Sequence, residues 1–311
     1  MRKRIDITKI KTVSLEKRKT KVALEDFART ARKGEAFGRF FDSLPNVLAA
    51  ENLKKIVAAV VQASKADKMV IVMMGAHVIK CGLSPIIIDL MKRRVVRAVA
   101  LNGAGIIHDT EIAMIGRTSE DVGAGIKDGT FGMVKETAAF INSAINSGFK
   151  KGLGIGESLG ERIVKAKLPN RGLSLLAAGH ELDIPVTVHV AIGTDTIHYH
   201  PSCNGEAVGE GSFLDFRNFI YSVSLIEGGV VLNIGSAVIL PEVFLKAVTV
   251  ARNLGHRADH FTAANFDMIA HYRPYQNVLV RPTSKGGRGY NIIGHHEIMI
   301  PLLYRAIIEE L

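Results

Sequence analysis

The chain has 311 residues, 47% of them hydrophobic, with 30 glycines and a formal net charge of +10. This apolar content is enough to bury the core of one large α/β domain. No apolar run reaches the roughly 18 residues that a membrane-crossing helix needs. Two cysteines, Cys81 and Cys203, cannot form a disulfide framework. The basic first twenty residues lack the apolar stretch of a secretory signal, so we expect a cytoplasmic protein.

Much of the positive charge lies in residues 1–22, which we interpret as a basic N-terminal arm. Nucleic-acid binding is one interpretation of such charge. It is not favoured, because aromatic side chains do not alternate with the basic ones as base stacking requires. A solvated surface or an anionic small-molecule substrate accounts for the charge equally well. A non-catalytic nucleotide- or nucleic-acid-associated protein stays an alternative, which salt-dependent binding to DNA or RNA would favour.

The predicted elements begin with helices over residues 22–42 and 47–65, where apolar residues recur at helical spacing. Residues 68–74 form a continuous apolar run closed by Gly75, which indicates a strand buried on both faces. Later elements follow in this order: helix 84–93, strand 95–101, helices 130–147, 156–167 and 172–181, strand 185–192, a helix near 212–226, strand 229–234, helix 241–254, strands 259–264, 277–281 and 290–293, and helix 297–310. This alternation predicts an α/β fold, a Rossmann-like parallel sheet flanked by helices, in one domain of residues 23–311.

Small, polar and histidine-rich segments follow the predicted strands. They read MMGAH, ALNGAGIIHD, VAIGTDTIHYH, LNIGSA, TAANFD, LVRPTSKGG and IIGHH. Ligands of an open parallel sheet bind beyond the carboxyl ends of its strands, so we expect all of these segments to converge on one crevice. The turn Asn102-Gly103-Ala104-Gly105 lacks the third glycine of the usual dinucleotide motif, which favours a variant nucleotide-binding fold.

Asp195 ends a predicted strand in a glycine-flanked turn, where a carboxylate can hold ribose hydroxyls or cap the following turn. His189, His198 and His200 lie nearby in sequence and allow a metal-dependent hydrolase as an alternative. We favour polar site walls or proton donors for these histidines. The loop 283–289, with Lys285 and three glycines, is typical of an anion-binding loop or of a mobile one.

The order of these segments resembles the deoxyhypusine synthase family over residues 45–311. That resemblance implies an NAD-binding Rossmann-like fold and a homotetramer. It also implies transfer of an aminobutyl group from spermidine to a lysine of an acceptor protein, through an imine on an enzyme lysine.

The residues that match the family are grouped in the cofactor half of its site. Seven segments of this chain correspond to segments of the family. They are the turn GAHVIKCG, Asn102-Gly103-Ala104-Gly105 with Asp109, Thr194-Asp195, Gly228-Gly229-Val230-Val231, Phe266-Asp267, Arg273-Pro274 and Ile300-Pro301-Leu302-Leu303. Together with the end of the last strand, they lead us to predict NAD contacts at Gly75, Gly82, Asn102, Gly103, Ala104, Gly105, Asp109, Asp195, Gly228, Gly229, Gly294 and His295.

The half of the site that holds polyamine in the family departs from its pattern. An acid is replaced by His200 and a histidine by Asn233, and further acids become Ile269, Ala270 and Gln276. The family tryptophan is missing. Lys285 is the nearest candidate for the catalytic lysine, with His198 or His200 as general base. We therefore predict catalytic roles for Lys285, His198, His200 and Asn233.

A polyamine needs carboxylates to replace its lost hydration. The expected rim is instead basic, with His77, Lys80, His108, His271, Arg273, Arg281 and Lys285. Such a rim suits a carboxylate or phosphate. The sequence thus predicts an NAD-dependent enzyme, either an aminoalkyl transferase or an enzyme of an anionic small molecule.

Overall fold

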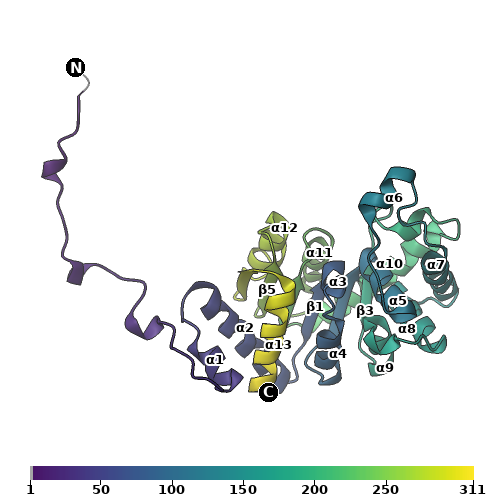
Figure 1. The fold of residues 1–311 in the computed structure, drawn as a ribbon, viewed down its shortest axis with the longest axis horizontal. Coiled ribbons are helices and arrows are strands. Elements are labelled where there is room, and N and C mark those ends of the chain that lie inside the picture. The colour runs from purple at the N-terminus through teal and green to yellow at the C-terminus, as the bar shows by residue number, and fades with distance from the viewer. Residues whose placement is uncertain (1–2) are drawn as a thin grey trace.

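The computed structural model describes residues 3–311, in which six parallel strands form one sheet flanked by helices (Figure 1). The strands are β1 (Val70–Met74), β2 (Ala98–Asn102), β3 (Val186–His189), β4 (Val230–Ile234), β5 (Thr262–Asp267) and β6 (Arg288–Ile293). Their order in the sheet is β3-β2-β1-β4-β5-β6. This is the doubly wound order, in which successive strands are added on one side of β1 up to β3 and then on its other side from β4 onward. The place between β1 and β4 is the switch point of the sheet. The predicted Rossmann-like α/β fold is confirmed.

Thirteen α-helices in the described residues accompany this sheet. They are α1 (Phe37–Ser43), α2 (Leu48–Lys65), α3 (Ala76–Lys80), α4 (Ser84–Lys92), α5 (Gly103–Ile115), α6 (Val122–Asp128), α7 (Lys135–Phe149), α8 (Ile155–Lys165), α9 (Leu175–Leu182), α10 (Gly205–Ser224), α11 (Ile239–Asn253), α12 (Tyr272–Pro274) and α13 (His296–Glu310). None of the helices in residues 3–311 combines the length and the apolar content needed to span a bilayer.

The central strands are buried on both faces, as their unbroken apolar runs predict. Alternate residues of β1 point into different cores: Val72 packs in the layer with α2, α4 and α13, and Met73 in the layer with α10 and α11. These two layers hold the sheet rigid, so the turns at its carboxyl edge are fixed relative to one another.

The free edge of β3 is covered by side chains of α10. The Asp215 carboxylate accepts hydrogen bonds from the backbone N–H groups of Val188 in β3 and Gly156 in α8, both at 2.9 Å. The Ser212 hydroxyl donates to the carbonyl of Val188 at 3.2 Å. The edge strand therefore offers few free backbone groups to another chain.

Two predicted elements are wrong. Residues 22–42 hold only a short 3-10 turn, Leu24–Asp26, and α1, because Gly34 has a left-handed backbone and interrupts the helix. The predicted strand 277–281 belongs to a π-helix, Tyr275–Val280, that begins directly after Pro274. A short β-branched run fits either state, and a preceding proline favours helix.

The arm that we predicted over residues 1–22 extends away from the body as far as the structure describes it, from residue 3 (Figure 1). Residues 1–2 lie outside the described part of the chain. Helices α3, α5 and α6 were not predicted, because α3 spans only five residues and the glycine-rich first turns of α5 and α6 are typical of loops.

Candidate functional site

The carboxyl ends of the strands meet at one edge, and the turns that follow β1 and β4 touch each other there. The Gly75 N–H donates to the carbonyl of Ile234 at 3.0 Å. A Cβ at Gly75 would lie 2.3 Å from the carbonyl oxygen of Gly235, so only glycine allows this approach. The predicted residue Gly82, with φ +74°, closes the short helix α3 that follows and has open space around it.

The turn after β2 starts helix α5. Asn102 is the N-cap, and its side-chain oxygen accepts from the Gly105 N–H at 3.0 Å. A Cβ at Gly103 would lie 1.9 Å from the Asp195 carboxylate, so the first turn of α5 and Asp195 are in direct contact. Ala104 borders a cavity beside them.

Asp195 comes from the loop after β3 and is 6% exposed. Burial raises the pKa of its carboxyl, and the nearby His198 and the Thr194 hydroxyl oppose that shift. His198 Nδ1 accepts N–H groups of Gly193 at 3.1 Å and Asp195 at 3.3 Å. Its Nε2 is therefore the protonated nitrogen, and it lies 4.0 Å from Asp195 Oδ2. His198 thus fixes the Asp195 loop. Because the lone pair of His198 Nδ1 already accepts these N–H groups, it is not available to accept a proton from a substrate.

His200 and Asn233 are both held by local bonds. The His200 Nδ1 is 2.7 Å from the Ser202 hydroxyl and accepts the Ser202 N–H at 3.2 Å. Asn233 is fully buried and donates to Asn265 at 2.7 Å, and Asn265 donates to Asn291 at 2.8 Å. This ladder of amides ties β4, β5 and β6 together below the carboxyl edge.

The end of β6 also reaches this edge. The Gly294 N–H donates to the carbonyl of Asp267 at 2.9 Å, and His295 is the N-cap of α13. The next residue, His296, is 1% exposed and donates from Nε2 to the carbonyl of Phe266 at 3.2 Å. Its ring packs against Gly235, so the turns after β4, β5 and β6 are joined.

Asp109 does not face the edge. Its carboxylate is fully buried and accepts from the Ser174 hydroxyl and from the Leu175 N–H at the start of α9. Burial raises the pKa of Asp109 to about 6, against those hydrogen bonds. This carboxylate joins α5 to α9, away from the cavity.

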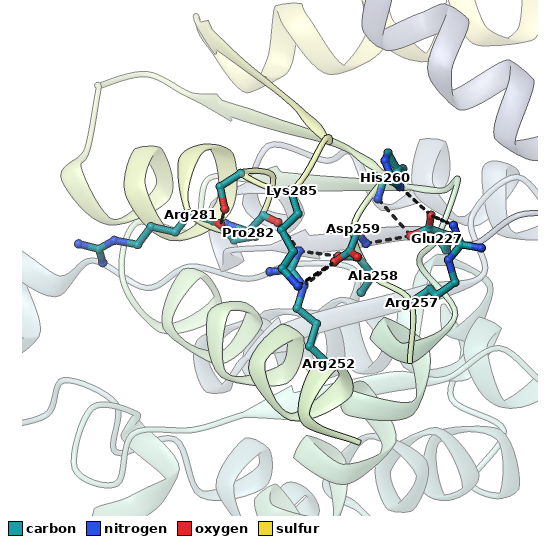
Figure 2. Close-up of polar contacts among 10 residues, drawn as sticks. Glu227, Arg252, Arg257, Ala258, Asp259, His260, Arg281, Pro282 and Lys285 are labelled. Atoms are coloured by element: carbon teal, nitrogen blue, oxygen red, sulfur yellow. Dashed lines mark hydrogen bonds and ion pairs between the residues drawn. The ribbon is translucent and has the colours of Figure 1, made fainter. Parts of the chain in front are cut away.

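Gly228, Gly229 and Lys285 lie at the opposite, amino-terminal edge of the sheet. Gly228 and Gly229 precede β4, and a Cβ at Gly229 would lie 2.2 Å from the carbonyl oxygen of Met69. Lys285 lies in the loop before β6, where its Nζ is 3.9 Å from Asp259 (Figure 2). Segment LVRPTSKGG is therefore the one predicted segment that does not join the others.

The surroundings of Lys285 form a network of ion pairs that Figure 2 shows. Arg252 contacts Asp259 at 3.2 Å, and Glu227 accepts from the backbone of Asp259 at 2.8 Å and from the His260 ring at 3.0 Å. Burial alone would raise the pKa of Glu227, but the hydrogen bonds from Asp259 and His260 lower it to about 2. The network fastens the loops that precede β4, β5 and β6.

The three histidines of the metal alternative are not brought together. His189 is buried in the sheet, with Nε2 3.0 Å from the Thr187 hydroxyl, and burial lowers its pKa to about 3. His198 and His200 use Nδ1 for backbone N–H groups. Within residues 3–311 no group of three His, Cys, Asp or Glu side chains has a geometry that could hold a metal ion.

A cavity of about 230 Å³ lies at the carboxyl ends of β2 and β3. Asp195 forms one wall, and polar and apolar residues from α3, α5, α7 and the loops after α5 and α6 form the others. Its charged or titratable residues are Lys80, His108, Glu111, Glu120 and Asp195. No sequence pattern points to Glu120 or the neighbouring Thr118, because the loop 116–121 has neither periodicity nor a motif.

Solved structures share this fold at low sequence identity. Unliganded AgrE matches with a TM-score of 0.56 and 14% identity, over 85% of this chain and 34% of AgrE. The ternary complex of AgrE with ornithine and NAD+ has a TM-score of 0.51 and 15% identity, over the same shares of the chains. A putative deoxyhypusine synthase from Entamoeba histolytica has a TM-score of 0.50 and 12% identity, over 88% of this chain and 93% of that one.

The chain spans about a third of the length of AgrE. No protein-family model and no curated protein sequence matches it. The structural matches establish the class of fold, which is the deoxyhypusine synthase-like α/β fold that the order of sequence segments resembles.

Proposed function

We propose that this protein is an NAD-dependent enzyme that oxidises a small molecule at a C–H bond next to nitrogen or oxygen. The observation that carries the proposal is the buried Asp195 carboxylate, which borders a cavity at the carboxyl edge of a doubly wound sheet. An acidic side chain in such a place binds ribose hydroxyls of dinucleotides. The complex of AgrE with ornithine and NAD+, in the same fold, supports this choice of cofactor.

The residues around Asp195 fit a dinucleotide. Gly103 leaves no side chain between the first turn of α5 and Asp195, and Asn102 keeps that turn in place. Asp195 and Thr194 would bind a ribose, and the Gly294 and His295 turn would border the other half of the cofactor. NAD supplies the hydride acceptor, and the chain supplies orientation and the removal of a proton.

Lys80 favours an anionic substrate. It is the cation on the cavity wall, so a substrate carboxylate or phosphate would pair with it. Glu111 and Glu120 on other walls suit an amine or hydroxyl on the same molecule. A small carboxylate that also bears an amine or hydroxyl therefore matches both kinds of wall, and ornithine, which AgrE binds, is one candidate to test.

Aminoalkyl transfer through an imine is the second candidate, and it would require a protein acceptor. It needs a lysine beside the cofactor. Lys80 lines the cavity that we assign to the site, whereas Lys285 pairs with Asp259 at the other edge. Borohydride reduction in the presence of spermidine and NAD tests it. We expect no covalent adduct; an adduct that survives Lys285→Ala and disappears in Lys80→Ala would support the transferase instead.

We also propose that the protein assembles as a homo-oligomer. The arm carries apolar side chains that are at least two-thirds exposed in the single chain, among them Ile5, Ile7, Ile10, Val13 and Leu15. A second copy would bury them. Sedimentation velocity tests the assembly.

Calorimetric titration with NAD tests the central proposal, which is that the protein binds this cofactor.

A further inference from the structure

Three side chains beside the cavity form a hydrogen-bonded relay. His108 and Glu111 lie one turn apart on α5, and Thr118 folds back from the loop that follows. The Thr118 hydroxyl lies 2.6 Å from His108 Nδ1 and donates its proton to Glu111 Oε2. The other oxygen of Glu111 accepts from the Thr137 hydroxyl of α7 at 3.2 Å.

This relay determines the tautomer of His108. A hydroxyl has one proton to donate, and Thr118 gives it to Glu111. The Thr118 oxygen must therefore accept from His108, which places the ring proton on Nδ1. Nε2 is left with a lone pair. Within residues 3–311 Nε2 has no hydrogen-bond partner, and the His108 side chain is 17% exposed on the cavity wall.

We propose that His108 is the proton acceptor of the oxidation, with Thr118 and Glu111 as positioning residues. The inference rests on the proposed function. NAD would accept the substrate C–H electron pair as hydride, and the adjacent O–H or N–H bond would give its proton to His108 Nε2. The substrate would gain a C=O or C=N bond, and Glu111 would stabilise the imidazolium through Thr118.

The charges that face His108 link this step to the substrate. Two effects lower the pKa of His108 to about 4: burial is the larger, and the nearby Lys80 ammonium is the second. The Glu120 carboxylate opposes them. Among the residues that line the cavity, Glu111 on the same helix and Asp195 on the opposite wall are the remaining charged groups, and α7 contributes the uncharged Thr137 and Ala138. A substrate anion paired with Lys80 removes the second cause, so the bound substrate itself makes His108 a stronger base.

The first test observes the tautomer directly, by NMR of protein labelled with 15N-histidine at neutral pH, without cofactor. We expect His108, assigned by the signal lost in His108→Gln, to carry its proton on Nδ1. Thr118→Val removes the hydroxyl at nearly constant volume and should give a mixture of tautomers. Thr249→Val, an exposed α11 threonine whose hydroxyl bonds only the backbone, should leave the spectrum unchanged. A proton on Nε2 in the wild type, or no change in Thr118→Val, overturns the proposal.

The second test uses activity and NAD affinity, with 2-hydroxy- and 2-amino-carboxylates as probes. We expect His108→Gln to lower kcat by about 100-fold or more, as loss of a general base does, with little change in the dissociation constant of NAD. The Lys80→Met variant should raise the pKa of His108 in the NMR titration. Unchanged kcat in His108→Gln overturns the role of His108. Absence of NAD binding in the wild type would refute the proposed function instead, and the tautomer would still be measurable.

Discussion

Asp215 lies where three elements meet, namely α10, the first turn of α8 and the edge strand β3. One of its oxygens accepts both the Gly156 and Val188 N–H groups. Burial raises its pKa to about 7, against those hydrogen bonds. Asp109 is buried in the same way, with its pKa raised to about 6. In both carboxyl groups, burial therefore disfavours the ionised form relative to water.

Stability should therefore decrease as pH rises from about 4 to about 7. The folded protein keeps the Asp215 proton up to a pKa of about 7, whereas an ordinary aspartate loses it near 3.8. The native state binds more protons in this window, so the free energy of unfolding falls with rising pH. Asp215→Asn keeps an acceptor for both N–H groups and cannot ionise. We expect it to lose less stability between pH 5 and pH 8, by about 1 kcal/mol or more, because one pKa unit is worth about 1.4 kcal/mol.

Urea unfolding at the two pH values measures this difference. Asp183→Asn is the matched control, because Asp183 is exposed and its left-handed backbone also suits asparagine. An identical pH dependence in wild type, Asp215→Asn and Asp183→Asn would contradict the argument.

Single residues of the site were predictable only where a strand pattern preceded them. Asp195 and Asn102 follow strands that apolar runs identify, and the structure brings them to one edge. Lys285 was expected there because residues 277–281 match a strand pattern, but they form a π-helix and Lys285 lies at the other edge. Glu120 and Thr118 lie in a loop without a pattern, and their contacts depend on the fold as a whole.

The geometry of the sheet edge between β1 and β4 depends on the close contact between the turns that follow these two strands. Gly75→Ala would put a methyl group 2.3 Å from the carbonyl oxygen of Gly235, which is backbone and cannot rotate away. We expect the free energy of unfolding to fall by about 1–3 kcal/mol, as overpacking usually costs.

Thermal unfolding compared with Gly209→Ala tests this expectation. Gly209 lies inside α10 with open space around it, so alanine there should be neutral or stabilising by up to about 1 kcal/mol. Equal effects of the two substitutions would show that the Gly75 approach is not tight.

At this scale the sequence predicts most of the sheet, because β1, β2 and β4 are apolar runs closed by glycine or polar turns. The helices α3, α5 and α6 could not be predicted with the same rules. Helix α3 spans only five residues, and the first turns of α5 and α6 are rich in glycine. Helix α5 forms because Asn102 caps it and neighbouring elements bury its apolar residues, such as Ile106.

At the scale of the whole molecule, the N-terminal arm extends away from the body, and its apolar side chains are largely exposed (Figure 1). If these side chains pack on a second copy, deletion of residues 1–22 should shift the protein toward smaller species in sedimentation velocity at equal concentration. The circular dichroism spectrum per residue of the body should stay nearly unchanged. The same assembly in full-length and shortened protein would contradict the proposal, and RNA binding that is lost with the arm would favour the nucleic-acid alternative.

The central claim is that the carboxyl edge of this sheet binds NAD through Asp195. Isothermal titration calorimetry of the purified protein with NAD tests it most directly, with Asp195→Asn as the variant and Asp183→Asn as the matched control. We predict binding by the wild type and by Asp183→Asn, and at least about 10-fold weaker binding by Asp195→Asn, because hydrogen bonds to a charged group contribute about 1.5–3 kcal/mol. No binding by the wild type, or equal affinity in all three proteins, would contradict the account.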